Sequence, residues 1–115
     1  MSKLSTVAVV GAGPYGLSVA AHLAAGGAEV RVFGASMQTW REGMPSGMFL
    51  KSEGFASSLS DPGGTFTLGH HCRERGIPYA DIGWPVPVEV FAAYGAEFAR
   101  RFVPGRDGRG WSAGR

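Results

Sequence analysis

The fold is decided by one stretch of the sequence, residues 7–17, which reads VAVVGAGPYGL. Apolar residues run into the pattern Gly11-x-Gly13-x-x-Gly16 and then into a helix-forming segment. Because the chain holds 19 glycines among 115 residues, such a spacing also arises by chance. The prediction therefore depends on what flanks the glycines.

The flanking segments predict a β-α-β unit. We predict a buried strand over Thr6–Val10, a helix over Pro14–Ala25 that Gly26 ends, and a second strand over Glu29–Phe33. A strand, a helix and a strand within about thirty residues form the start of a dinucleotide-binding fold. The alternative is a glycine-rich turn between a strand and a helix that binds no ligand.

Each glycine of the turn has its own physical role. Gly11 allows the tight turn after the strand. Gly13 lets the backbone approach a pyrophosphate, and Gly16 lets the helix pack closely on the strand. The first amides of the helix then point at the phosphates, and Pro14 suits the first helical position.

Length and strand count indicate one incomplete domain. A chain of 115 residues holds at most one domain, and no third strand of the same kind follows Phe33. We therefore expect an α/β fold, a partial Rossmann-like (doubly wound) FAD/NAD(P)-binding fold with a β-α-β start, an irregular loop and helices. Residues 1–104 are expected to be the N-terminal part of that domain, and residues 105–115 a disordered or aberrant tail.

Charge and cysteine content exclude several classes of partner. The net charge is +2 and the basic residues are scattered, so we expect no nucleic-acid partner. The single cysteine excludes an internal disulfide and suits a reducing compartment. No signal peptide or membrane span is visible, which predicts a cytoplasmic chain without a membrane partner.

The rest of the chain predicts two helices behind a long loop. Gly34–Gly64 is irregular and ends in a turn at Asp61–Gly64. A short helix is expected over 67–75, capped by Thr67 and ended by Gly76. A longer helix is expected over Val88–Val103. Its apolar stripe predicts a packing surface rather than an aromatic binding site, and consists of Phe91, Tyr94, Phe98 and Phe102.

With these segments in view, the chain resembles the N-terminal, FAD-binding part of FAD-dependent monooxygenases. The likeness is to flavin-containing and lysine/ornithine N-monooxygenase-like enzymes, over about residues 6–104. The residues that carry it are Val9–Ser18, Val30–Phe33, Trp40, Met44–Leu50, Asp61-Pro62, Thr65–Leu68 and Val88–Tyr94. The later NADPH-binding module of such enzymes is missing, which predicts a truncated or frame-shifted reading frame.

The resemblance implies a cofactor site. Its cofactor is FAD, with NADPH as co-substrate and a small-molecule substrate in the full-length enzyme. The glycine turn would hold the ADP half, and Trp40, Met48 and Leu50 would form part of the flavin wall. The expected cofactor-binding residues are Gly11, Ala12, Gly13, Pro14, Tyr15, Gly16, Gly34, Trp40, Met48 and Leu50. We expect no catalytic residue and no metal ligand on this chain.

Two departures from the family pattern keep alternatives open. The acidic residue that binds the ribose at the end of the second strand is replaced by Gly34, so this position does not exclude NADP. In Lys51–Ser60 the basic and amide residues with which siderophore-type N-hydroxylases bind their amino-acid substrate do not align, so lysine or ornithine is not the expected substrate. The alternatives are an NAD(P)-binding module of a dehydrogenase or reductase, and a non-catalytic truncated remnant.

Other polar clusters predict no chemistry. His70-His71-Cys72 suggests a metal site, but adjacent helical residues point about 100° apart and no partner motif exists. We expect surface histidines and a buried free cysteine there. Asp61, Asp81 and Glu53 form no spaced acid/base pair.

Overall fold

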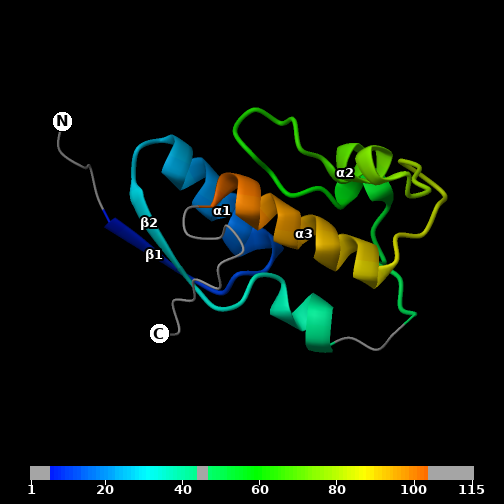
Figure 1. Ribbon diagram of the computed structural model, residues 1–115, viewed down its shortest axis with the longest axis horizontal. Coiled ribbons are helices and arrows are strands. Elements are labelled where there is room, and N and C mark those ends of the chain that lie inside the picture. The colour runs from blue at the N-terminus through cyan, green and yellow to red at the C-terminus, as the bar shows by residue number, and fades with distance from the viewer. Residues whose placement is uncertain (1–5, 44–46, 104–115) are drawn as a thin grey trace.

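The computed structural model describes residues 6–43 and 47–103. The predicted tail, 105–115, lies outside the described residues, as do residues 44–46 of the family-like segment. The described residues form a mixed α/β structure with a two-stranded parallel sheet (Figure 1). None of the described helices is long and apolar enough to cross a membrane.

The N-terminal β-α-β unit has the predicted bounds. It consists of β1 (Thr6–Val10), α1 (Pro14–Ala25) and β2 (Glu29–Phe33). β1 and β2 pair in parallel from Thr6↔Glu29 to Val10↔Phe33. The amide of Gly11 extends the ladder by donating to the carbonyl of Phe33 at 2.9 Å. The connection between parallel strands has to cross over, and α1 provides it while covering one face of the sheet.

The two later helices also form where expected. α2 spans Leu68–Arg75, and the Thr67 hydroxyl caps it by accepting from the amide of His70 at 3.1 Å. Gly76 ends it with φ of +67°. α3 spans Val88–Phe102, one residue shorter than expected, and begins after Pro87.

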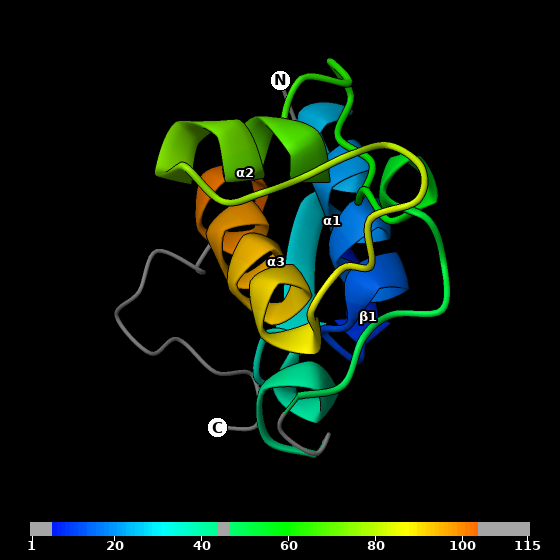
Figure 2. The ribbon, with the colours of Figure 1, turned by 90° about the vertical axis from the view of Figure 1, so that its right-hand side faces the viewer.

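The core lies between α1, β2 and α3. Figure 2 shows α3 beside α1, with α2 across one end of α3. The predicted packing stripe is confirmed, because Phe91, Tyr94 and Phe98 are buried and Phe102 packs against them. α1 contributes Leu17, Ala20 and Ala21, and β2 contributes Val30 and Val32.

The long loop is less irregular than expected. It contains one π-helical turn, η1 (Thr39–Gly43), and one 3-10 turn, η2 (Gly54–Ala56). η1 packs against α3, and η2 packs against α2. The predicted turn at Asp61 is confirmed, since the amide of Gly64 donates to the carbonyl of Asp61 at 2.9 Å.

The prediction that β1 is buried is wrong. Val10 is 86% exposed, and Thr6 and Ala8 are exposed as well. Among the described residues, β1 pairs along one edge only, and α1 covers only the face that carries Val7 and Val9. An apolar strand is buried on both faces only where neighbours cover both.

Candidate functional site

The three glycines of the turn between β1 and α1 meet different constraints. Gly11 has φ of +98°, which disfavours any side chain. A Cβ on Gly16 would lie 2.1 Å from the carbonyl oxygen of Gly11, so close packing demands glycine there. Gly13 has φ of −82°, and a Cβ on it would meet only the Trp40 ring, at 3.4 Å. Gly13 is the N-cap residue of α1, where glycine is favoured over alanine, but neither a positive φ nor a backbone clash requires glycine there.

The start of α1 offers unused backbone donors. The carbonyl of Gly13 accepts from the amide of Leu17 at 2.9 Å, and no side chain caps the helix. Within 6–43 and 47–103, the amides of Ala12, Gly13 and Tyr15 donate to no protein acceptor. Such amides, at the positive end of a helix dipole, suit an anionic ligand.

Gly34, the expected ribose position, lies directly against this turn. A Cβ on Gly34 would be 3.6 Å from the amide nitrogen of Ala12. The residue has φ of +113°, which an Asp or Glu would adopt only under strain. The backbone conformation therefore accounts for the missing carboxylate.

A cavity of about 260 Å³ opens beside the turn. It brings together four of the expected cofactor-binding residues, Pro14, Tyr15, Trp40 and Leu50, from three separate segments. Serines and apolar side chains complete the wall: Ser18, Ser52, Ala56, Ser57, Ser58, Leu59 and Phe91. Trp40 is held edge-on against Phe91, with ring centroids 5.9 Å apart.

Met48 is not part of this wall. Its side chain is 41% exposed, and its carbonyl accepts from the amide of Val88 at 2.9 Å. The structure thus groups Trp40 and Leu50 with the glycine turn and leaves Met48 apart from them.

A segment around the predicted turn at Asp61 reaches the cavity with Ser57, Ser58 and Leu59, which were not among the expected cofactor-binding residues. We call residues 57–66 the strap. The Tyr94 hydroxyl accepts from the amide of Leu59 at 2.8 Å and donates to the carbonyl of Phe66 at 2.9 Å. Burial raises the pKa of Tyr94 to about 12, so the hydroxyl keeps its proton for this bond. The only sequence signal for this anchor was a tyrosine within a stripe of phenylalanines.

Asp61 stabilises the turn of the strap and is not available as an acid or base. Its carboxylate accepts from the amides of Thr65 at 3.2 Å and Phe66 at 3.1 Å. Burial alone would raise the pKa of Asp61, but these hydrogen bonds outweigh it and lower the pKa.

The cluster at His70-His71-Cys72 differs from its prediction at one residue. Cys72 is a buried free cysteine, as expected, and His70 is partly exposed. His71, expected at the surface, is only 1% exposed, because it faces α3. In the described part of the chain, no three His, Cys, Asp or Glu side chains are grouped to hold a metal ion.

Comparison with known proteins yields no match: no protein-family model, no curated protein and no solved structure corresponds to this chain.

Proposed function

We propose that this chain is the FAD-binding portion of a flavin-dependent, NADPH-using monooxygenase-type oxidoreductase with a partial Rossmann-like fold. The observation that carries the proposal is Gly13. It leaves the backbone between the unused amides of Ala12 and Tyr15 without a side chain, and within 4 Å an added Cβ would meet only the Trp40 ring. A pyrophosphate is the ligand that needs such close backbone approach.

The neighbouring cavity supports a ligand with an aromatic ring beside its phosphates. Trp40 and Tyr15 offer aromatic surface next to the turn, while the Ser52 and Ser57 hydroxyls that also line the cavity are hydrogen-bonded to each other at 2.8 Å. Bound FAD would supply the electron transfer and oxygen chemistry that amino-acid side chains lack. The chain's own part is to hold the pyrophosphate at Gly11–Gly16 and to shield the ring with Trp40 and Leu50.

An NAD(P)-binding module is the second candidate, and Gly34 favours it. A carboxylate at that position would repel a 2′-phosphate, whereas Gly34 presents only backbone. The two candidates share the pyrophosphate site and differ in the ring that enters the cavity.

Binding of FAD and NADPH to the purified chain tests both. We expect flavin absorbance in the isolated protein, or quenching of flavin fluorescence when FAD is added. Gly13→Ala should weaken FAD binding by about tenfold or more, because the methyl group holds the phosphates away from the amides. The matched control is Gly26→Ala at the other end of α1, which shares φ of −82° and whose added Cβ would meet only the carbonyl oxygens of His22 and Leu23, at 3.5 and 3.6 Å.

Each result has a definite meaning. NADPH binding that is lost in Gly13→Ala, without FAD binding, would select the second candidate. A folded chain that binds neither cofactor, or a Gly13→Ala variant that binds FAD as tightly as Gly26→Ala does, would contradict the proposal.

A further inference from the structure

His71 lies in an apolar environment that suits only its neutral form. The residue is on α2, is 1% exposed, and packs against the rings of Phe66 and Tyr94 with centroids 6.0 and 5.6 Å away. Neither ring nitrogen has a hydrogen-bond partner among the described residues. A buried polar group without a partner is uncommon, and a charged one would be far more costly.

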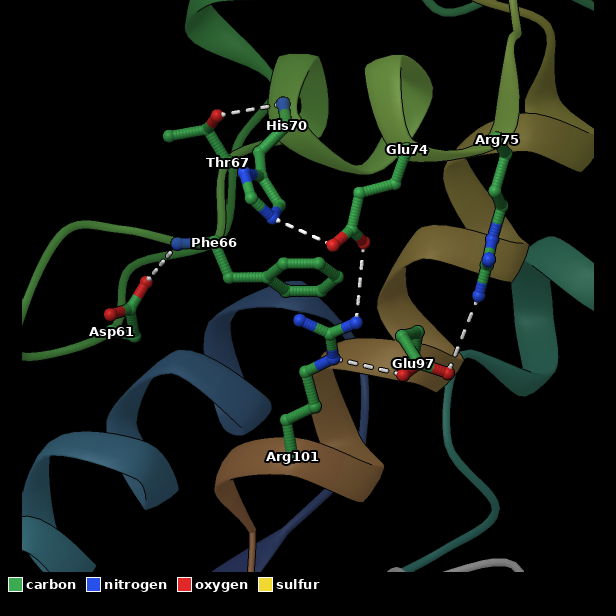
Figure 3. A network of polar contacts seen from close by, with 8 residues as sticks. All are labelled: Asp61, Phe66, Thr67, His70, Glu74, Arg75, Glu97 and Arg101. Atoms are coloured by element: carbon green, nitrogen blue, oxygen red, sulfur yellow. Dashed lines mark hydrogen bonds and ion pairs between the residues drawn. The ribbon is translucent and has the colours of Figure 1, made fainter.

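The charged side chains that act on His71 are Glu74, Arg75, Glu97 and Arg101, and Figure 3 shows that they are paired with one another. On α2, His70 contacts Glu74 at 3.1 Å. From α3, Arg101 reaches Glu74 at 3.3 Å and Glu97 at 2.9 Å, and its guanidinium lies over the Phe66 ring at 4.2 Å.

Glu97 is further engaged by two more arginines. Arg75 of α2 lies 3.7 Å from its carboxylate, and Arg100 also contacts it. Both nearby carboxylates are therefore occupied, and neither accepts a hydrogen bond from His71. Burial first, and then the positive charge of Arg75, lower the pKa of His71, against the smaller opposing effect of Glu97 and Glu74.

We propose that His71 is a pH-sensitive latch between α2 and α3. The neutral ring fills the space between Phe66 and Tyr94, whereas the protonated ring has to leave it. Tyr94 also holds Leu59 and Phe66 of the strap, so opening of the latch loosens the strap and with it one wall of the cavity. This proposal does not depend on which cofactor, if any, the cavity binds.

The sign of the effect follows from the lowered pKa. The unfolded chain takes up a proton at His71 near its ordinary pKa of about 6.5, and the folded chain does so only at lower pH. Stability is therefore full above pH 6.5 and falls as the pH drops below it. When the folded ring stays neutral over this range, the unfolding equilibrium constant rises about tenfold between pH 7.5 and 5.5. Asp61 and Glu97, whose pKa values are lowered, titrate below this window.

Urea denaturation at pH 7.5 and 5.5 tests the latch in the full chain. Wild type should show the tenfold rise, and His71→Leu should remove it. His70→Gln is the matched control, because it removes the adjacent, partly exposed histidine and should keep the rise. Hydrogen exchange of the Leu59 amide, corrected for the intrinsic pH effect, should be faster at pH 5.5 in wild type and unchanged in His71→Leu.

A second measurement uses wild type alone and therefore tests the proposal even if His71→Leu fails to fold. In wild type, the imidazole NMR signals of folded His71 should keep the neutral form at pH 5.5. A folded protein with protonated His71 and an undisturbed Leu59 amide would overturn the proposal. So would a wild-type stability that does not change between the two pH values.

Discussion

The half of the molecule made by β1, α1 and β2 and the half made by α2, α3 and the strap are stabilised differently. In the first half, strand pairing fixes the geometry, while Val10 remains 86% exposed and the amides at the start of α1 are unused. In the second half, Phe66, Tyr94 and Phe98 are fully or almost fully buried, and the surface carboxylates are paired. Tight packing of side chains stabilises the second half, whereas backbone donors remain unused at the start of α1 in the first half.

The largest expected effect comes from replacing a phenylalanine by alanine, once in each half. Phe98→Ala should lower the free energy of unfolding by about 4 kcal/mol, since it leaves a cavity in a close-packed aromatic cluster. Phe33→Ala on β2 should cost less than half as much, about 1.5 kcal/mol, because Phe33 is already 37% exposed. Urea denaturation of both variants measures the difference. Equal losses would show that the sheet face is as well packed as the aromatic cluster.

The second expected effect compares two glycines of the turn, Gly16 and Gly13. Gly16→Ala should lower the free energy of unfolding by about 3 kcal/mol, because its methyl group would overlap the backbone carbonyl of Gly11. Gly13→Ala should lower it by only about 1 kcal/mol, since only the edge of Trp40 lies near and the remaining cost is that alanine is a poorer N-cap residue than glycine. Thermal or urea unfolding of the two variants checks this.

Gly13→Ala is the more informative of the two variants. If it destabilises the chain as much as Gly16→Ala does, Gly13 is a structural glycine and the main support for a pyrophosphate site is lost. If it folds normally, a loss of cofactor binding reports on the ligand alone.

The elements were predictable from the sequence because local signals specify them. Gly11 follows β1, Gly26 follows α1, Thr67 and Gly76 cap α2, and Pro87 precedes α3. Burial was not predictable to the same degree. The sequence of β1 is that of a covered strand, but its exposure depends on which strands and helices lie beside it, and among the described residues only β2 and α1 do.

The candidate site was predictable in part, for a similar reason. The turn follows from its glycines, and the resemblance indicated Trp40 and Leu50, which do line the cavity. The position of Trp40 over Gly13 results from η1 packing on α3, a contact between segments far apart in sequence. The same is true of His71, because the helical spacing of α2 does not reveal which of its faces meets α3.

The smallest expected effect tests whether the turn at Asp61 helps to hold the strap in place, or whether its contacts with the aromatic cluster suffice. Asp61→Asn removes a carboxylate that accepts from two amides, and the new amide group cannot accept on both sides. We expect a loss of about 1.5 kcal/mol at pH 7. Exposed Asp81, which accepts from the Tyr79 hydroxyl at 2.7 Å, provides the control, since Asp81→Asn keeps an acceptor and should cost less than about 0.5 kcal/mol.

The pH dependence of this loss identifies its cause. The pKa of Asp61 is lower in the folded chain than its unfolded value of about 3.9, so its contribution is present above pH 4 and disappears as the pH falls through the folded pKa. The stability difference between wild type and Asp61→Asn should therefore shrink in acid. A difference that stays constant down to pH 2 would mean that the shape of the turn, and not the carboxylate charge, holds the strap. In that case the hydrogen bonds of Tyr94 to Leu59 and Phe66, and not the Asp61 carboxylate, would keep the strap in place.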